Sequence, residues 1–549
     1  MKIFRLLLTL LILSFLSAYT SPTHVLADSE FSTNFTSSYE VLETGSTNVR
    51  HQVQIINNLS HIYTTDYSIV IGENNLTNVK VTSGGLLAPE ETTTSENTTT
   101  LNIKIPNPVV GKDRITDLDI SYTSENIAEH NGNIWEINIP KLSKANEAKS
   151  FTRTITFPNS LSKPTIVSPR PTNITQNSIN NQTTYSYNGF PTDSITLLFG
   201  TSQLYELDLT YNITNPSRNT SNTEIALPLD TDYQRVTLDS IVPPPSEIKL
   251  DSDQNWLAVY SLSPDQTLDV KAKVYIEIFP TPTLNYSPNL ANLTSPQKYW
   301  ETKNTTISSL GVKLKSPQNI YNYLLNNYSY SYARVGVGSE RLGALKALSS
   351  PGSAICTEFT DTFIALARAI GIPAREINGY AHTTNDLLRP LELATDVLHA
   401  WPEYYDETSG HWIQVDPTWG NTTGGIDYFS KMDFNHLAFV RHGQEPDYPY
   451  PPGAYKQDSR DKTVNVKIVE NIPSPTPSFA LSNSDSKTVV TNTGNVALHD
   501  YPITLEDGSS YQINYLPPFG HETISPKLLP KLSFFEHIYN FLKNLFAPH

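Results

Sequence analysis

Three residues in the middle of the chain have the side-chain types that catalysis by a thiol nucleophile requires. Cys356 is the single cysteine of the 549-residue sequence, and His399 and Asp416 follow it. In such sites a thiolate attacks a carbonyl carbon, an imidazole moves the proton, and a carboxylate orients the imidazole. We therefore take Cys356 as the candidate nucleophile, His399 as the candidate base and Asp416 as the candidate orienting residue.

The lone thiol has two interpretations. A single cysteine cannot form an internal disulfide, and a free thiol in an oxidising compartment is prone to oxidation. Cys356 is either a small buried apolar residue, which is common for free cysteine, or a reactive group. The residues that surround it and its two candidate partners favour the reactive group.

The helix that must position the cysteine is visible in the spacing of apolar residues after it. Apolar side chains recur at steps of three and four from Phe359 to Ile370, which predicts an amphipathic helix with one face in the core. Gly371 ends this helix and Pro373 prevents its continuation. Cys356 then lies at or just before the first turn, where main-chain N–H groups and the helix dipole stabilise a thiolate or an oxyanion.

A β-hairpin is predicted to bring the other two residues together. Two strand-like segments flank a turn of Asp, Glu, Thr, Ser and Gly. If Tyr405 pairs with Gly410, His399 lies directly opposite Asp416, with both side chains on one face of the hairpin. The carboxylate can then fix the tautomer of the ring and stabilise the imidazolium.

Several linked motifs in this region resemble the core of the transglutaminase-like superfamily. They are Cys356-Thr357-Glu358-Phe359, the segment from Arg368 to Arg375, Gly379-Tyr380, His399-Ala400-Trp401, Trp412 and Asp416-Pro417-Thr418. The resemblance implies a papain-like fold, in which a helix with the cysteine packs on an antiparallel sheet that carries the histidine and the aspartate. It also implies that Cys356 is the nucleophile, His399 the base and acid, and Asp416 the orienting residue.

Two residues depart from the pattern of this family. Ala354 stands where the family often has glycine, two positions before the cysteine. Pro402 follows the His-Ala-Trp motif, and because proline lacks a ladder donor we expect an edge or an irregularity of the strand there. Neither departure removes a reacting group.

Other residues in this region have both a functional and a structural interpretation. Trp401, Trp412 and Tyr380 are candidates to line the substrate, although such aromatic residues are at least as often packing residues. Arg375 either contacts a substrate or, as we prefer, anchors the helix-to-strand turn through a salt bridge. No His, Cys and Glu cluster has a metal-ligand spacing, so we expect neither a metal ion nor a cofactor.

The whole chain is predicted to be a multidomain, β-rich protein. Charged residues make up only 17% of the sequence, as is typical of extracellular β proteins, and the length allows roughly three or four domains. Period-two alternation predicts β-sandwich modules over residues 28–165 and 172–280. Mixed helix and strand patterns predict an α+β papain-like domain over 300–445, and residues 461–528 resemble an Ig-like β module.

Both ends of the chain carry apolar segments. A positive start, an apolar run from Leu6 to Leu16 and a small-residue site ending at Ala27 predict a secretory signal peptide over residues 1–27, with an uncleaved anchor as the alternative. The protein is therefore expected to be secreted or on the cell surface. Residues 530–549 predict an amphipathic helix that docks on the protein itself, on a partner or on a membrane surface.

Composition and chemistry together narrow the expected function. A net charge of −16, with no cluster of basic residues, excludes a nucleic-acid partner. The expected partner is a protein or peptide substrate whose carboxamide or peptide bond is attacked through a thioester. Water as the acceptor gives a protease or amidase, whereas an amine gives acyl transfer. The alternative is a non-catalytic surface scaffold or adhesion protein that binds peptides through an enzyme-like domain.

Overall fold

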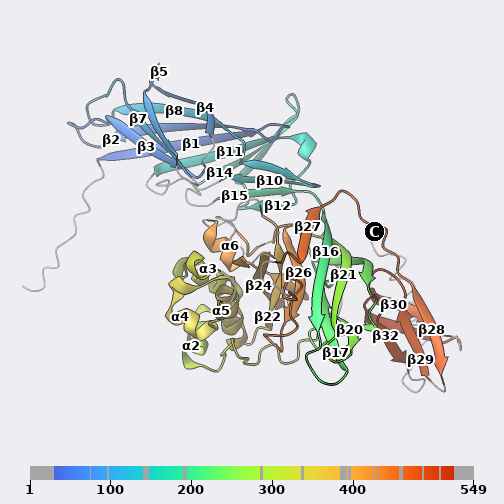
Figure 1. Ribbon diagram of the computed structural model, residues 1–549. Coiled ribbons are helices and arrows are strands. Elements are labelled where there is room, and N and C mark those ends of the chain that lie inside the picture. The colour runs from blue at the N-terminus through green and yellow to red at the C-terminus, as the bar shows by residue number, and fades with distance from the viewer. Residues whose placement is uncertain are drawn as a thin grey trace, which may run out of the picture.

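The computed structural model describes residues 30–524, apart from 74–75, 95–97, 140–147, 190–193, 285–288, 336–338, 384–391, 394–396, 424–426, 431, 457–460, 485–486 and 506–507. The expected signal peptide and the expected helix at 530–549 lie outside the described residues. Strands dominate the described part, and its α-helices gather between residues 305 and 422 (Figure 1). None of the helices in these ranges is both long enough and apolar enough to cross a membrane.

The first β module contains three sheets around one apolar core. An eight-stranded sheet has the order β13-β14-β11-β1-β2-β8-β4-β5, in which β1 runs parallel to β11 and antiparallel to β2. Its strands are β1 (Phe31–Val41), β2 (Thr47–Asn57), β4 (Leu76–Ser83), β5 (Leu86–Leu87), β8 (Ile115–Ser124), β11 (Ala148–Pro158), β13 (Asn173–Asn177) and β14 (Gln182–Asn188). The other two sheets comprise β3 (Asp66–Ile71), β6 (Glu90–Thr94) and β7 (Thr99–Lys104), and β9 (Ala128–Asn131), β10 (Ile134–Ile139), β12 (Ile166–Ser168) and β15 (Ile195–Phe199).

This module extends further along the chain than the sequence patterns predict. β14 pairs with β11, β13 pairs with β14, and β15 pairs with β10. Tyr185, Leu197 and Phe199 belong to the same core as Val53 of β2. The boundary expected between residues 165 and 172 therefore lies inside the first module. The pairing joins strands far apart in the sequence, so the alternation within each strand cannot reveal it.

The second β module begins at β16 and has two sheets over one core. Its strands are β16 (Gln203–Thr214), β17 (Ser221–Leu227), β18 (Gln234–Val242), β19 (Glu247–Leu250), β20 (Trp256–Leu262), β21 (Thr267–Ile278) and β27 (Val464–Ile468). β27 comes from the segment expected to begin the C-terminal module, yet it pairs antiparallel with β16. The polypeptide between β21 and β27 is thus inserted into the second module.

This insertion is a mixed domain of helices and one sheet whose described strand pairs are all antiparallel. The sheet has the order β23-β24-β22-β26, and β25 pairs with β24 as well. Its strands are β22 (Ala374–Ala381), β23 (Glu392–Leu393), β24 (Val397–Asp406), β25 (His411–Gln414) and β26 (His436–His442). Its helices are α2 (Thr305–Leu314), α3 (Pro317–Asn327), α4 (Ala344–Ser349), α5 (Cys356–Ala369) and α6 (Pro417–Thr422). α5 is the central helix, because it contacts α2, α3, α4 and α6 as well as β22 and β24.

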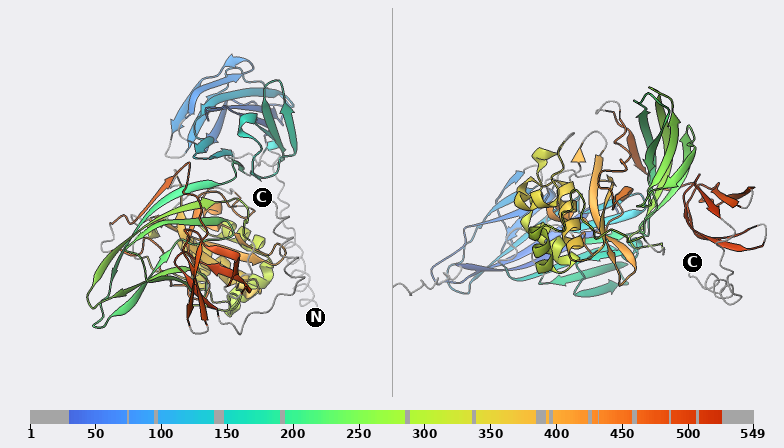
Figure 2. Two further views of the ribbon diagram at one scale, coloured as in Figure 1. Left: turned by 90° about the vertical axis from the view of Figure 1, so that its right-hand side faces the viewer. Right: turned by 90° about the horizontal axis from the view of Figure 1, so that it is seen from below.

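A small β module follows β27 at the C-terminal side, away from the helices (Figures 1 and 2). Its strands are β28 (Phe479–Ser484), β29 (Lys487–Asn492), β30 (Leu498–Thr504), β31 (Ser510–Leu516) and β32 (His521–Ile524). They enclose a core of their own that includes Val490 and Ile513.

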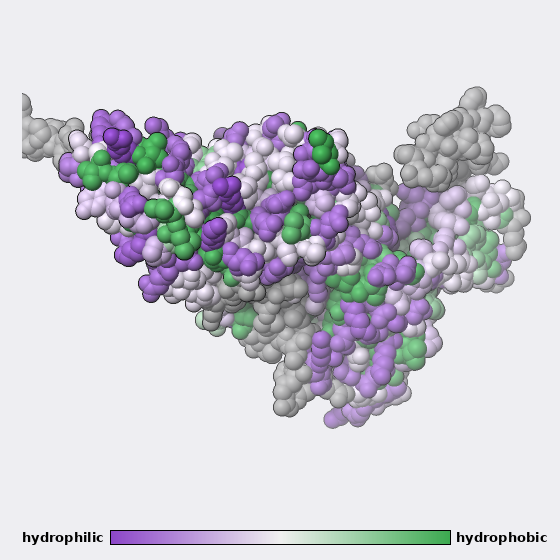
Figure 3. All heavy atoms as spheres, turned by 90° about the horizontal axis from the view of Figure 1, so that it is seen from above, coloured by the Kyte–Doolittle hydropathy of each residue, from purple (hydrophilic) through white to green (hydrophobic). Residues whose placement is uncertain are grey.

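The segment between α6 and β26 is held by both β modules. Phe434 is buried against apolar side chains of β10, β12 and β15, namely Ile134, Ile166 and Leu198. Tyr205 of β16 donates its hydroxyl to the main-chain oxygen of Phe434 at 3.0 Å and to the side-chain oxygen of Asn435 at 3.2 Å. Seen from above the view of Figure 1, the first module presents a mostly hydrophilic face with separate apolar patches (Figure 3).

Candidate active site

Cys356 is the first residue of α5, as the apolar spacing predicts. Ile355 is the N-cap residue, and the side chains of Phe359 and Phe363 are buried in the domain core. Gly371 follows the last turn with a φ of 84°, a left-handed conformation that glycine adopts without strain. Cys356 thus lies in the first turn, where the main-chain N–H groups lack the partners four residues earlier that the helix interior provides.

A buried carboxylate anchors this first turn. Glu358 accepts hydrogen bonds from the main-chain N–H of Ile355 at 3.0 Å and of Leu342 at 2.9 Å. Arg334 lies 2.8 Å from the same carboxylate and compensates its charge. The start of α5, and with it Cys356, is therefore tied to the segment that precedes it.

His399 lies on β24, beside the start of α5. Its cross-strand partner on β22 is Gly379. The hydroxyl of Thr360 in α5 donates to the main-chain oxygen of Ala400 at 3.1 Å. Cys356 precedes Thr360 by one helical turn and shares its side of α5. The beginning of the helix therefore packs against the part of β24 that carries the histidine.

Pro402 lies on a central strand rather than at an edge, and the ladder between β24 and β25 ends one residue short of it, whereas the ladder with β22 continues. The main-chain oxygen of Pro402 accepts a hydrogen bond from Val415 N at 3.1 Å, on the side of β24 away from β22. In an antiparallel strand the nitrogen and the oxygen of one residue point the same way. The missing N–H of Pro402 therefore faces the interval between β23 and β25, and no bond to β22 is lost.

The predicted hairpin exists, but the predicted register is wrong. Tyr405 pairs with Trp412 rather than with Gly410, because the turn between β24 and β25 contains four residues. The strands are therefore displaced by two residues from the expected pairing. Asp416 comes after the end of β25 and does not lie opposite His399.

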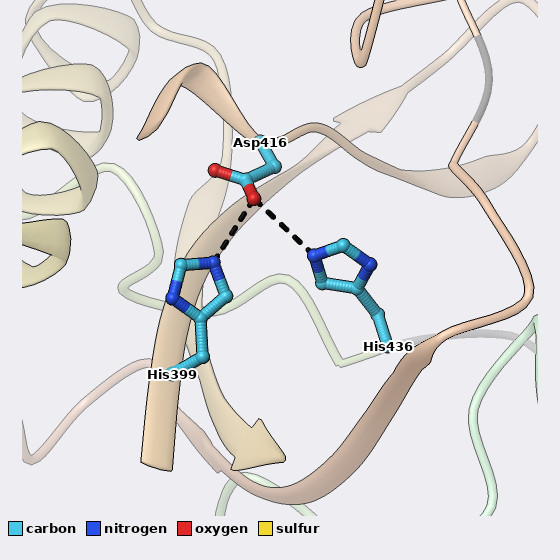
Figure 4. A group of neighbouring side chains, drawn as sticks. All are labelled: His399, Asp416 and His436. Atoms are coloured by element: carbon cyan, nitrogen blue, oxygen red, sulfur yellow. Dashed lines mark hydrogen bonds and ion pairs between the residues drawn. The ribbon is translucent and has the colours of Figure 1, made fainter. Parts of the chain in front are cut away.

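Asp416 reaches the histidine as the N-cap residue of α6 instead. One carboxylate oxygen, Oδ1, accepts from the main-chain N–H of Thr418 at 2.8 Å and of Trp419 at 3.1 Å. The other, Oδ2, lies 2.9 Å from Nε2 of His399 (Figure 4). Burial raises the pKa of Asp416, but the charges and hydrogen bonds of His399 and His436 outweigh burial and hold this pKa well below its usual range. Asp416 is therefore an ionised acceptor.

The hydrogen bond to Asp416 determines which nitrogen of His399 is basic. An ionised carboxylate can only accept, so Nε2 of the neutral ring carries the proton. Nδ1 is buried and has no hydrogen-bond partner among the residues that the structure describes. Nδ1 is thus the nitrogen with which His399 can take a proton from a thiol.

A second histidine, which the sequence analysis missed, completes the group in Figure 4. His436 is the first residue of β26; its Nε2 lies 3.2 Å from Oδ2 of Asp416, and its Nδ1 lies 2.7 Å from Oδ1 of Asp433. The rings of His399 and His436 have centroids 5.6 Å apart. The only sequence signals for His436 are the acidic residue three positions earlier and the apolar strand that follows it.

The same three side chains have the proximity that a metal ion would need. The ligand atoms of His399, Asp416 and His436 lie within 4.8 Å of one another. Hydrogen bonds already join both histidines to one carboxylate oxygen, and Asp433 holds the other nitrogen of His436. Shared protons account for the cluster without a metal ion.

Two tryptophans pack around the imidazole of His399. Trp401 and Trp419 are fully buried, and their ring centroids lie 5.8 Å and 5.3 Å from that of His399, in stacked orientations. A Cβ atom at Gly379 would collide with the main chain of Leu437 and crowd Trp401, so this glycine permits the close packing. Trp401 thus surrounds the histidine, whereas contact with a substrate stays a prediction.

The structure places Trp412 and Tyr380 in packing interfaces. The Arg375 guanidinium lies 3.8 Å from the ring centroid of Trp412, and Arg375 also forms the expected salt bridge, with Glu403. The main-chain N–H of Trp412 donates to Asp232 of the second β module at 3.1 Å. Tyr380 is half-buried against the core of that module. A substrate-lining role for Trp412 and Tyr380 stays a prediction.

The fold and this site define a transglutaminase-like domain. Residues 302–417 match the model of the transglutaminase-like superfamily, and the chain therefore carries a domain of this family. Among curated proteins, none matches the chain.

Solved structures with similarity to this chain include two whose own length is matched almost completely. A candidate cysteine protease from Cytophaga hutchinsonii is 17% identical with a TM-score of 0.29, over 49% of this chain and 98% of that one. The periplasmic domain of TgpA from Pseudomonas aeruginosa is 15% identical with a TM-score of 0.24, over 41% of this chain and 92% of that one. An M1 zinc metallopeptidase from Deinococcus radiodurans is 11% identical with a TM-score of 0.22, over 35% and 45% of the two chains.

Proposed function

We propose that the protein is a secreted or surface cysteine enzyme that attacks carboxamide or peptide bonds through a thioester. The observation that carries the proposal is the hydrogen bond between His399 Nε2 and Asp416. This bond leaves Nδ1 as the basic nitrogen, on the part of β24 against which the Cys356 end of α5 packs. The family match at residues 302–417 supports the same assignment.

The reaction begins when His399 takes the thiol proton from Cys356. The thiolate attacks the carbonyl carbon, and the carbonyl π electrons move to its oxygen to give a tetrahedral oxyanion. The oxyanion then collapses, the C–N bond breaks, and the imidazolium of His399 gives its proton to the leaving amine. An acyl thioester on Cys356 remains.

The acceptor completes the reaction. Water or a primary amine attacks the thioester carbon while His399 takes the proton of the acceptor. The C–S bond breaks, and the thiolate leaves with that electron pair. Water gives a carboxylic acid and amine gives a new amide, and the outcome depends on how well the site excludes water.

The burial of the site is the observation that supports a second candidate function, a non-catalytic scaffold. The side chains of Cys356, His399 and Asp416 are each 0% exposed, so the site is closed in this structure. A substrate reaches the sulfur only if covering segments move. A non-catalytic scaffold that binds peptides elsewhere on the chain needs no such movement.

Labelling of the sole cysteine separates the two functions. A thiol-reactive amide probe on the mature protein can label only Cys356. The enzyme requires fast labelling that is absent in Cys356→Ala and at least tenfold slower in His399→Ala. His411→Ala is the matched control, because His411 lies on the same hairpin but binds Asp232 at 3.2 Å. Slow labelling that is indifferent to His399 supports the scaffold.

Product masses then identify the reaction. The protein is incubated with glutamine-containing peptides, with and without a primary amine. Amine adducts indicate transfer, shorter peptides indicate proteolysis, and a gain of about one dalton indicates deamidation. Unchanged peptides in every reaction, together with slow labelling, would contradict the proposed enzyme.

Secretion is proposed from the N-terminal sequence alone. A mature protein that begins at Asp28, found outside the cell by N-terminal mass spectrometry, is the expected result. Retention of residues 1–27 on a membrane-bound protein would indicate the anchor instead. Contact of residues 530–549 with a membrane surface or a partner also stays a prediction.

A further inference from the structure

We propose that His436 is a positioning residue of this site: held by Asp433, it keeps Asp416 ionised and oriented while His399 gains and loses its proton. The inference rests on the proposed function of Cys356 and deepens it. It concerns a residue outside the cysteine, histidine and aspartate that the family resemblance assigns.

The hydrogen bonds of His436 indicate a cation. Each of its ring nitrogens faces a carboxylate oxygen, Nε2 that of Asp416 and Nδ1 that of Asp433. Ionised carboxylates can only accept, so both nitrogens must donate. Burial lowers the pKa of His436, but Asp433 and Asp416 outweigh burial and raise this pKa to about 9. His436 is therefore an imidazolium at neutral pH.

This cation solves an electrostatic problem in the reaction cycle. When His399 gives its proton to the leaving amine, Asp416 loses a positive neighbour inside a fully buried site. An unpaired buried carboxylate tends to take up a proton, and a protonated Asp416 no longer orients the imidazole as required. His436 stays charged through this step and preserves the acceptor for His399 Nε2–H.

The surroundings of His436 fix its position. Oδ1 of Asp433 also accepts from the main-chain N–H of Asn435 at 2.8 Å, which closes a tight turn before β26. The rings of Trp401 and Trp419 lie 4.9 Å and 4.5 Å from that of His436. A second conformation of the ring would have to displace these buried side chains. Asp433 and the two tryptophans thus hold His436 in one position beside Asp416. We call the pair of Asp433 and His436 the clamp.

The sharpest test removes both charges of the clamp together. In the double variant Asp433→Asn/His436→Gln, neither partner is left as an unpaired buried charge, so the fold is expected to persist. His442→Gln is the matched control, because His442 is a buried histidine on the same strand, 2.9 Å from a carboxylate oxygen of Glu376. The rate of Cys356 alkylation is measured against pH in all three proteins, and kcat and KM are measured with the best amide substrate.

A positioning role predicts a specific pattern. In the double variant kcat falls about ten- to a hundredfold while KM changes little. The alkylation rate of Cys356 falls at acidic pH, and the pH at which it has fallen by half, its midpoint, moves up by about one unit. The reason is that Asp416 is protonated more easily without the positive charge of His436. Both quantities stay at the wild-type value in His442→Gln. A folded double variant with wild-type kcat and midpoint overturns the proposal, as does an equal shift in His442→Gln.

The proposal remains testable if no substrate is turned over or if the double variant does not fold. The alkylation profile needs no substrate, so it judges His436 even if no amide is turned over and the proposed function fails. If the double variant does not fold, Asp433→Asn alone is used, since His436 then keeps its bond to Asp416 but loses the charge of Asp433. Its Cys356 alkylation is expected to match wild type at pH 5.5 and to differ severalfold at pH 8, where the unclamped ring loses its charge. Identical rates at both pH values overturn the proposal.

Discussion

His399 and Asp416 meet at 2.9 Å although they are not cross-strand neighbours. The imidazole comes from a central strand, whereas the carboxylate is the cap of a short helix after the hairpin. Asp416 therefore has two tasks, since one oxygen orients His399 and the other holds the first turn of α6. These tasks can be separated by substitution.

Two variants of Asp416 are expected to differ in stability more than in activity. Asparagine caps helices nearly as well as aspartate, whereas alanine does not and costs about 1 kcal/mol at such a position. Both variants lose the anionic acceptor of His399, so kcat should fall about a thousandfold or more in each. Thermal unfolding and kinetics of Asp416→Asn and Asp416→Ala check this. Wild-type kcat in Asp416→Asn would show that His399 needs no carboxylate.

The stability of the protein should depend on pH through His436. Its pKa of about 9 in the folded protein exceeds the ordinary 6.5, so folding favours the protonated ring. The resulting stability is fully present below pH 6.5 and is lost as the pH rises through 9. The groups that face this ring are Asp416, Asp433, His399 and Tyr428. Tm should therefore fall between pH 6.5 and 9.

The double variant Asp433→Asn/His436→Gln is the reference for this pH effect. Burial lowers the pKa of His442, but Glu376 outweighs burial, so this pKa lies above its ordinary value. The contribution of His442 is present in the wild type and in the double variant. The difference between the two Tm profiles therefore reports His436. Parallel profiles over this range would show that His436 does not titrate there.

Arg375 should support the fold rather than the chemistry. Its buried salt bridge with Glu403 leaves an unpaired carboxylate when Arg375 is replaced by alanine, which costs about 3–5 kcal/mol. Lys298→Ala is the control, because its pair with Asp447 is exposed to solvent and should contribute little to stability. Urea unfolding measures both. A large rise in KM of folded Arg375→Ala, without loss of stability, would instead indicate substrate contact.

Phe434 should couple the first β module to the active-site strand. Phe434→Ala removes a buried ring from its cluster with Ile166 and Leu198 and costs about 3–5 kcal/mol. Hydrogen exchange at the start of β26 should accelerate, because the segment before His436 loses its anchor. Phe519→Ala, at an exposed phenylalanine, is the control and should leave this exchange unchanged. Unchanged exchange in Phe434→Ala would show that the module contact does not support the site.

Local patterns predicted the parts of the site that local forces determine. The apolar spacing after Cys356 and the glycine and proline that follow it define α5 without help from the rest of the fold. The register of the hairpin was wrong because turn length, rather than strand composition, sets it. His436 was missed because Asp416, its other partner, comes from a different element, and a histidine three residues after an aspartate has no distinctive spacing.

The larger architecture was harder to predict for the same reason. Alternation identified strands in both β regions, but not that β13 and β14 return to β11 or that β27 pairs with β16. Such pairings depend on which sheet edges meet in three dimensions. The family motifs helped only within the inserted domain, where they belong to two helices, α5 and α6, and one sheet.

Pairing of β16 with β27 has a mechanical consequence for a protein that is tethered at one end. Tyr205 lies beside Ile468, so the polypeptide enters and leaves this part of the molecule at adjacent points. Tension along the backbone would load this ladder before it reaches the inserted domain, which stays bypassed until the ladder opens. Cys356, His399 and Asp416 lie in the inserted domain and are thereby shielded from stretching.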